Sequence, residues 1–100
     1  MIQIEIGVPT AADVSKAQHV IEGCCKSMGL RTTLKGTLRA YPGCVHWHFK
    51  KNKERGTLEI TLWRRERRIW FSIQAGRNGA WIEESLARLE PAIRRRLSKG

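Results

Sequence analysis

Residues 57–74 read TLEITLWRRERRIWFSIQ, and this stretch decides the fold because two alternating runs flank one charged turn. Successive side chains of a strand point to opposite faces, so apolar residues at every second position predict strands that are buried on one side. If Arg64 pairs with Arg67 across the turn, Leu62 faces Ile69 in the core. The sequence therefore predicts an antiparallel hairpin with a defined register.

The same register predicts which side chains meet on the other face of this hairpin. Trp63 and Trp70 become diagonal neighbours there, close enough for large rings to interact. We expect both tryptophans to be exposed and ringed by arginines. The predicted outward pairs are Trp63 with Arg68, Thr61 with Trp70, and Glu59 with Ser72.

Three more alternating runs precede the hairpin, at residues 2–8, 30–40 and 44–50. Each predicts a strand with one apolar side. From residues 30–40 we expect Leu30, Thr32 and Leu34 to face the core and Arg31, Lys35 and Arg39 to face outward. From residues 44–50 we expect Val45, Trp47 and Phe49 to face the core and Cys44, His46, His48 and Lys50 to face outward.

Two segments instead repeat apolar residues at spacings of three and four, which predicts amphipathic helices. The first starts near Thr10 and Asp13, which suit a helix start, and stops at Gly29. The second runs from about residue 80 to 97. Pro91 should kink or divide it, because proline interrupts the hydrogen-bond ladder. We expect the tail to fray.

The predicted fold is an α+β two-layer sandwich of β-α-β-β-β-β-α order, formed by residues 1–100 as a single domain with a basic C-terminal tail at about 94–100. Short connections favour a mostly antiparallel five-stranded sheet, with both helices on one face and the other face open to water. This order resembles one repeat of the TATA-box-binding-protein-like fold, whose free sheet face meets DNA. Rearranged double-stranded-RNA-binding-like and ferredoxin-like arrangements remain alternatives.

The charge is the strongest global signal, because the formal net charge is +10 and most of it lies in the second half. Such a field attracts polyanions. There is no apolar run long enough to span a membrane and no signal-peptide pattern, and three cysteines suit a reducing compartment. We therefore expect a cytoplasmic protein.

From charge and pattern together we expect a small nucleic-acid-binding domain that uses the open sheet face. Arginines beside aromatic rings are what single-strand binding needs, because bases stack on the rings while cations hold phosphates. DNA and RNA are not distinguished. The expected contact residues are Arg31, Lys35, Arg39, His46, His48, Lys50, Trp63, Arg64, Arg65, Arg67, Arg68 and Trp70.

His46 and His48 share one face of their strand, with Glu59 opposite His48 in the simplest register. One alternative function is a small ribonuclease that uses these histidines as acid and base, with Glu59 as a weaker candidate. Another is a protein-interaction subunit, which would form a homodimer through Trp63 and Trp70. Strand alternation explains the His-x-His spacing without a metal. We therefore expect no metal and no cofactor. The sequence leaves enzymatic activity open and favours a binding domain over an enzyme.

Overall fold

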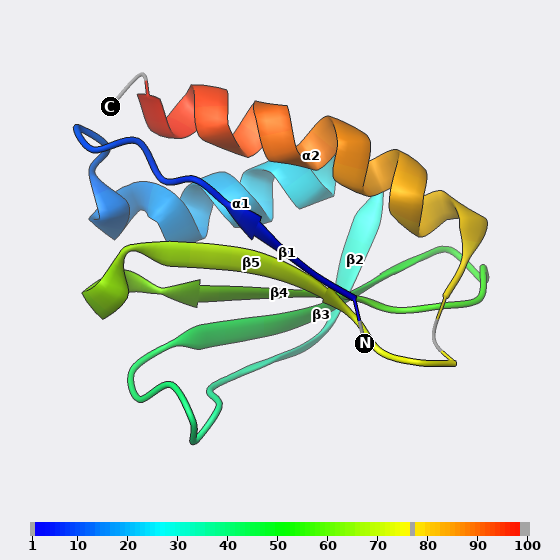
Figure 1. Ribbon diagram of the computed structural model, residues 1–100. Helices are drawn as coiled ribbons and strands as arrows, with labels where there is room; N and C mark the ends of the chain where they lie inside the picture. The colour runs from blue at the N-terminus through cyan, green and yellow to red at the C-terminus, as the bar shows by residue number, and fades with distance from the viewer. Residues whose placement is uncertain (1, 77, 99–100) are drawn as a thin grey trace.

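A computed structural model describes residues 2–76 and 78–98. Two α-helices and five strands follow one another in the predicted order, with a short 3₁₀ helix before the first α-helix and another in the central hairpin (Figure 1). The elements are β1 (Ile2–Ile6), η1 (Val14–Lys16), α1 (Ala17–Ser27), β2 (Leu30–Gly36), β3 (Val45–Lys51), β4 (Leu58–Trp63), η2 (Arg64–Glu66), β5 (Arg68–Ile73) and α2 (Ala80–Ser98).

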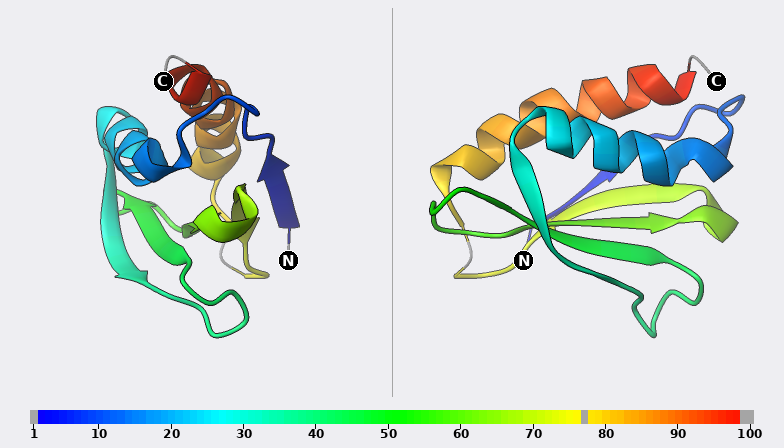
Figure 2. Two further views of the ribbon diagram at one scale, coloured as in Figure 1. Left: turned by 90° about the vertical axis from the view of Figure 1, so that its left-hand side faces the viewer. Right: turned by 180° about the vertical axis from the view of Figure 1, so that it is seen from behind.

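The strands form one sheet in the order β1-β5-β4-β3-β2, and every neighbouring pair is antiparallel. The two helices lie side by side on the same face of this sheet (Figures 1 and 2). Apolar side chains from both helices and from the facing side of the strands form one core. The predicted α+β sandwich with both helices on one face is confirmed.

The register of the central hairpin is also as predicted. Leu62 pairs with Ile69 and Thr61 with Trp70. The turn closes through a hydrogen bond from the Arg67 amide to the Arg64 carbonyl at 3.0 Å. In the neighbouring ladder His48 pairs with Glu59, which is the simplest register that the sequence allowed.

The prediction for β2 is wrong from Leu34 onward, because a β-bulge lies between Thr32 and Leu34. A bulge adds one residue to one strand and so exchanges the faces of all residues that follow. Lys35 therefore lies on the helix side, where its Nζ is 2.7 Å from Oε2 of Glu22 in α1. Leu34, predicted to be inward, is 47% exposed on the other face.

The helix predictions need three corrections. Asp13, not Thr10, caps the first turn, because its carboxylate accepts the Ser15 amide proton and precedes a 3₁₀ turn. Pro91 does not divide α2, which continues through it to Ser98. Residues 94–98 of the expected basic tail are therefore helical, and residues 99 and 100 lie outside the described part of the chain.

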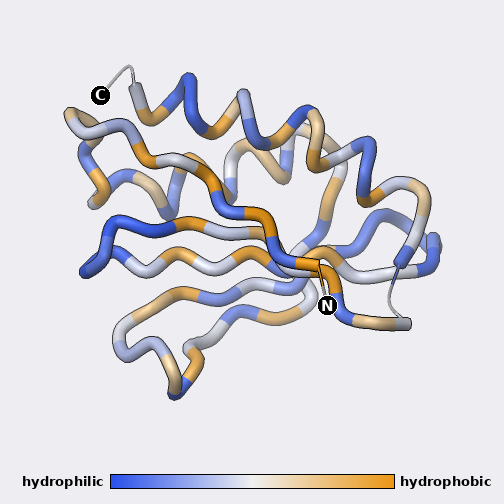
Figure 3. The backbone as a smooth tube through the Cα atoms, in the orientation of Figure 1, coloured by the Kyte–Doolittle hydropathy of each residue, from blue (hydrophilic) through white to orange (hydrophobic). Residues whose placement is uncertain are grey.

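The two most hydrophilic connections lie at opposite ends of the sheet (Figure 3). The η2 turn lies at one end of β4, and the loop of residues 52–57 lies at the other (Figure 1). The free face of the sheet therefore extends between these two charged loops.

Within the described residues, no helix is long and apolar enough to cross a membrane.

Candidate functional site

The sheet face away from the helices is not uniformly open to water, which corrects the sequence expectation. Its centre is a layer of polar side chains that their neighbours cover. Glu59 is 4% exposed and His46 is 6% exposed, although both lie on the face opposite the helices. The other buried polar residues of β4 and β5 on this face are Thr61 and Ser72.

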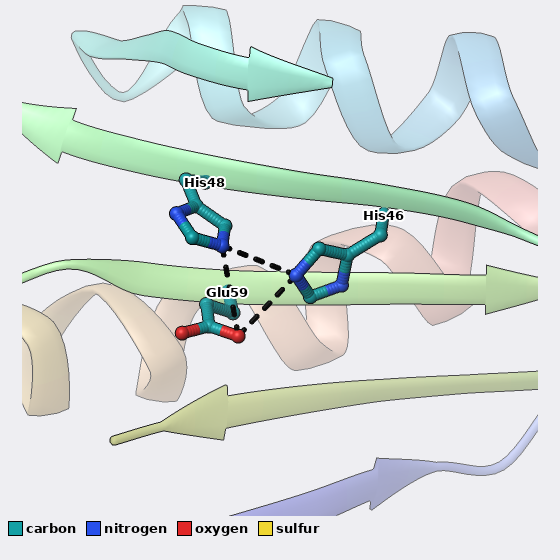
Figure 4. A group of neighbouring side chains, drawn as sticks. All are labelled: His46, His48 and Glu59. Atoms are coloured by element: carbon teal, nitrogen blue, oxygen red, sulfur yellow. Dashed lines mark hydrogen bonds and ion pairs between the residues drawn. The ribbon is translucent and has the colours of Figure 1, made fainter. Parts of the chain in front are cut away.

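Two histidines and one glutamate meet at the middle of this layer (Figure 4). His46 and His48 project from β3 and Glu59 projects from β4, on the side of the sheet away from the helices (Figure 4). The two Nε2 atoms are 3.2 Å apart. Oε1 of Glu59 lies 3.3 Å from Nε2 of His46 and 3.8 Å from Nε2 of His48. We call these three residues the His-Glu centre.

Thr61 orients His46, because its Oγ1 lies 2.8 Å from Nδ1 of this histidine. Burial lowers the pKa of His46 below its usual value, and this effect outweighs the attraction of the Glu59 carboxylate. His46 is thus held neutral, with Nδ1 engaged and Nε2 directed at the other two side chains. Such an arrangement can pass a proton between imidazoles or ligate a metal ion.

The aromatic end of the face lies beyond this centre, and here the expectation of two exposed tryptophans is wrong for Trp70. Trp70 is 3% exposed, because Tyr41 packs edge-on against it with the ring centroids 4.8 Å apart. The Cζ atom of Arg68 also lies 4.6 Å from the centroid of the Trp70 ring. Trp63 is half-buried, with its ring 5.1 Å from Tyr41 and its Nε1 donating to the Pro42 carbonyl. The loop of residues 37–44 provides this cover, and alternation in the strands gave no sign of it.

The arginines near the η2 turn mostly have partners within the chain. Arg67 donates to the carbonyls of residues 9, 10 and 12 and so anchors the loop after β1. Arg68 holds the Glu5 carboxylate through two hydrogen bonds of 3.0 and 2.8 Å. Arg64 donates to Gln18 on α1, whereas Arg65 is exposed. These contacts give Arg67 and Arg68 structural roles beyond those that the sequence predicted.

A basic pocket of about 490 Å³ lies at the opposite end of the face. Lys50 and Arg55 supply its positive charge and His48 forms part of its wall, so it adjoins the His-Glu centre. No acidic side chain is among the described residues that line it. The complete lining is Thr33, His48, Lys50, Arg55, Gly56, Thr57 and Gly76.

Arg55 was missed by sequence reasoning, because it lies in the polar loop that joins β3 to β4. A tertiary contact fixes this loop: Nε1 of Trp81 donates to the Arg55 carbonyl at 2.7 Å. Gly79 makes the approach feasible, since a Cβ there would collide with the same carbonyl oxygen. The sequence KNKER (residues 51–55), which ends at Arg55, shows that the loop is charged. The position of Arg55 beside His48 depends on this long-range contact.

The remaining expected contact residues are dispersed. Arg31 lies across from Lys50 and donates to the Asn52 carbonyl, so it belongs to the basic end. Arg39 is exposed in the loop after β2 and not on a strand, and Lys35 lies on the helix side. Cys44, expected to face outward beside His46, is buried and its sulfur accepts the Leu38 amide proton.

No protein-family profile, curated protein or solved structure matches this chain. The geometry and charge of the sheet face are therefore the features that indicate a function.

Proposed function

We propose that this protein is a small nucleic-acid-binding domain whose contact surface is the sheet face away from the helices. The observation that carries the proposal is the basic pocket formed by Lys50 and Arg55 on that face. The resemblance in element order to the TATA-box-binding-protein-like fold, whose free sheet face meets DNA, points to the same surface.

The charge of the pocket suits a phosphate backbone. Lys50 and Arg55 line this pocket together with the hydroxyl-bearing residues Thr33 and Thr57, so two cations and two polar side chains surround one space. Phosphate oxygens accept hydrogen bonds from such groups, and released counterions add to the affinity. Arg31 extends the same positive surface along the edge strand β2.

The aromatic end supplies the second element of the proposed surface. Trp63 and Tyr41 are partly exposed, whereas Trp70 is covered beneath Tyr41. A base can therefore contact Trp63 or Tyr41, and Trp70 serves to position Tyr41. Stacking on one aromatic ring contributes roughly 1–3 kcal/mol per base. A nucleic-acid strand that contacts both the basic pocket and the aromatic end would pass over the His-Glu centre.

The test is fluorescence anisotropy with single- and double-stranded DNA and RNA, measured at a series of salt concentrations. The wild type is compared with the double variant Lys50→Gln, Arg55→Gln. Each lost phosphate contact should reduce the slope of log affinity against log salt by about one, so we expect a decrease of about two. Wild-type affinity should also retain a preference among the four probes at the highest salt.

The matched control is Arg88→Gln, Arg95→Gln, which removes the same charge from the groove between the two helices. Its slope should equal that of the wild type. Equal losses in both double variants would mean that the protein attracts polyanions by net charge alone, and the proposed surface would then be wrong.

A further inference from the structure

The His-Glu centre is a cluster of three side chains whose chemistry exceeds what phosphate binding requires. Among the described residues, it is the group of His, Cys, Asp and Glu side chains whose ligand atoms converge, all within 4.8 Å of one another. We propose that His46, His48 and Glu59 bind one divalent cation of the zinc class. The proposal is independent of nucleic-acid binding.

The distances between the three atoms suit one ion. Two ligands of a zinc ion with bonds of about 2.1 Å lie about 3.0–3.4 Å apart. The pairs involving His46 are 3.2 and 3.3 Å apart. The third pair, Nε2 of His48 and Oε1 of Glu59, is 3.8 Å apart. A small rotation of the more exposed His48 side chain would bring this distance into the same range.

The surroundings of His46 are those of a metal ligand. A ligating histidine normally bonds through its other ring nitrogen to a fixed partner, which sets the tautomer and the ring orientation. Thr61 is this partner: it is fully buried, and its Oγ1 contacts Nδ1. This contact at Nδ1 leaves Nε2 directed at the centre, where it lies 3.3 Å from Oε1 of Glu59.

Two histidines and one glutamate form the ligand set of zinc sites that keep a position open for water or substrate. The same kinds of ligand serve ferrous iron. His46 and Glu59 are buried, whereas the His48 side chain is 21% exposed and lines the basic pocket. The ion therefore enters past His48, and a water or an anion from the pocket would complete its coordination.

The test is calorimetric titration of zinc chloride into the purified, reduced protein without nucleic acid. The wild type should bind one ion per chain. His48→Ala and Glu59→Gln should weaken binding by more than the roughly 10–100-fold expected for loss of an outer-shell partner, and Thr61→Val should fall within that range. Glu59→Gln is nearly isosteric, and circular dichroism verifies that each variant is folded.

The matched control is His19→Ala, which removes the exposed histidine on α1, outside the centre. It should bind zinc as the wild type does. Cobalt(II) gives a second readout, since visible absorption reports its coordination and should be lost with His48→Ala. If the wild type binds no stoichiometric zinc, or if His48→Ala and Glu59→Gln bind it unchanged, the centre is a hydrogen-bonded polar cluster and the inference is wrong.

Discussion

Cys25 shows at the scale of one residue how strongly the core controls chemistry. It lies on the buried side of α1 and is inaccessible to solvent. Burial, with smaller contributions from the nearby Cys24 and Glu22, raises the pKa of its thiol to about 12. The thiolate is the reactive form, so this thiol should be inert in the folded protein.

We therefore expect Cys25 to resist alkylation by iodoacetamide at pH 8 in the folded protein and to react fully in denaturant. Peptide mapping by tandem mass spectrometry separates Cys25 from its neighbour Cys24. Labelling of Cys25 in the native protein at the rate seen in denaturant would contradict the burial of this face of α1.

At the scale of the element, the bulge in β2 has the largest effect on the candidate surface. It turns Lys35 toward Glu22 on α1 and leaves Leu34 exposed beside His48. Lys35, which the sequence predicted on the nucleic-acid face, thus forms an ion pair with α1. Leu34 is exposed on that face in its place.

This strand geometry can be tested with two leucines. Leu34→Ala should change the free energy of unfolding by no more than about 0.5 kcal/mol, as at other exposed sites. Leu62→Ala, in the core of β4, should cost about 2–5 kcal/mol because it leaves a cavity. Urea denaturation measures both. A cost for Leu34→Ala similar to that for Leu62→Ala would place Leu34 in the core and exclude the bulge.

Local pattern predicted the elements that depend on alternation and turn chemistry. The central hairpin register and the pairing of His48 with Glu59 followed from the spacing of residues 44–74. The bulge at Thr33 did not, because regular alternation continues through it in the sequence. The cover over Trp70 also depends on a loop contact with Tyr41 that no local rule specifies. The sequence likewise placed His46 and His48 together without showing that both converge on Glu59.

At the scale of the whole molecule, the two layers divide the surface by role. The helices and the core occupy one face of the sheet, and the other carries a basic pocket, a buried polar centre and an aromatic cluster along its length. At the basic end, the described residues that line the pocket with Lys50 and Arg55 include no aspartate or glutamate. A chain with a net charge of +10 thus carries a basic pocket on the sheet face away from the helices.

The most direct measurement is a nuclear magnetic resonance titration of the isotope-labelled protein with the oligonucleotide that binds best. We predict chemical-shift changes in the amides of β3, β4 and the loop of residues 52–57, with those on the exposed side of α2 unchanged. Lys50→Gln with Arg55→Gln should abolish the changes at the basic end. Changes concentrated on α2, or spread evenly over every basic segment, would contradict the claim that the free sheet face binds nucleic acid.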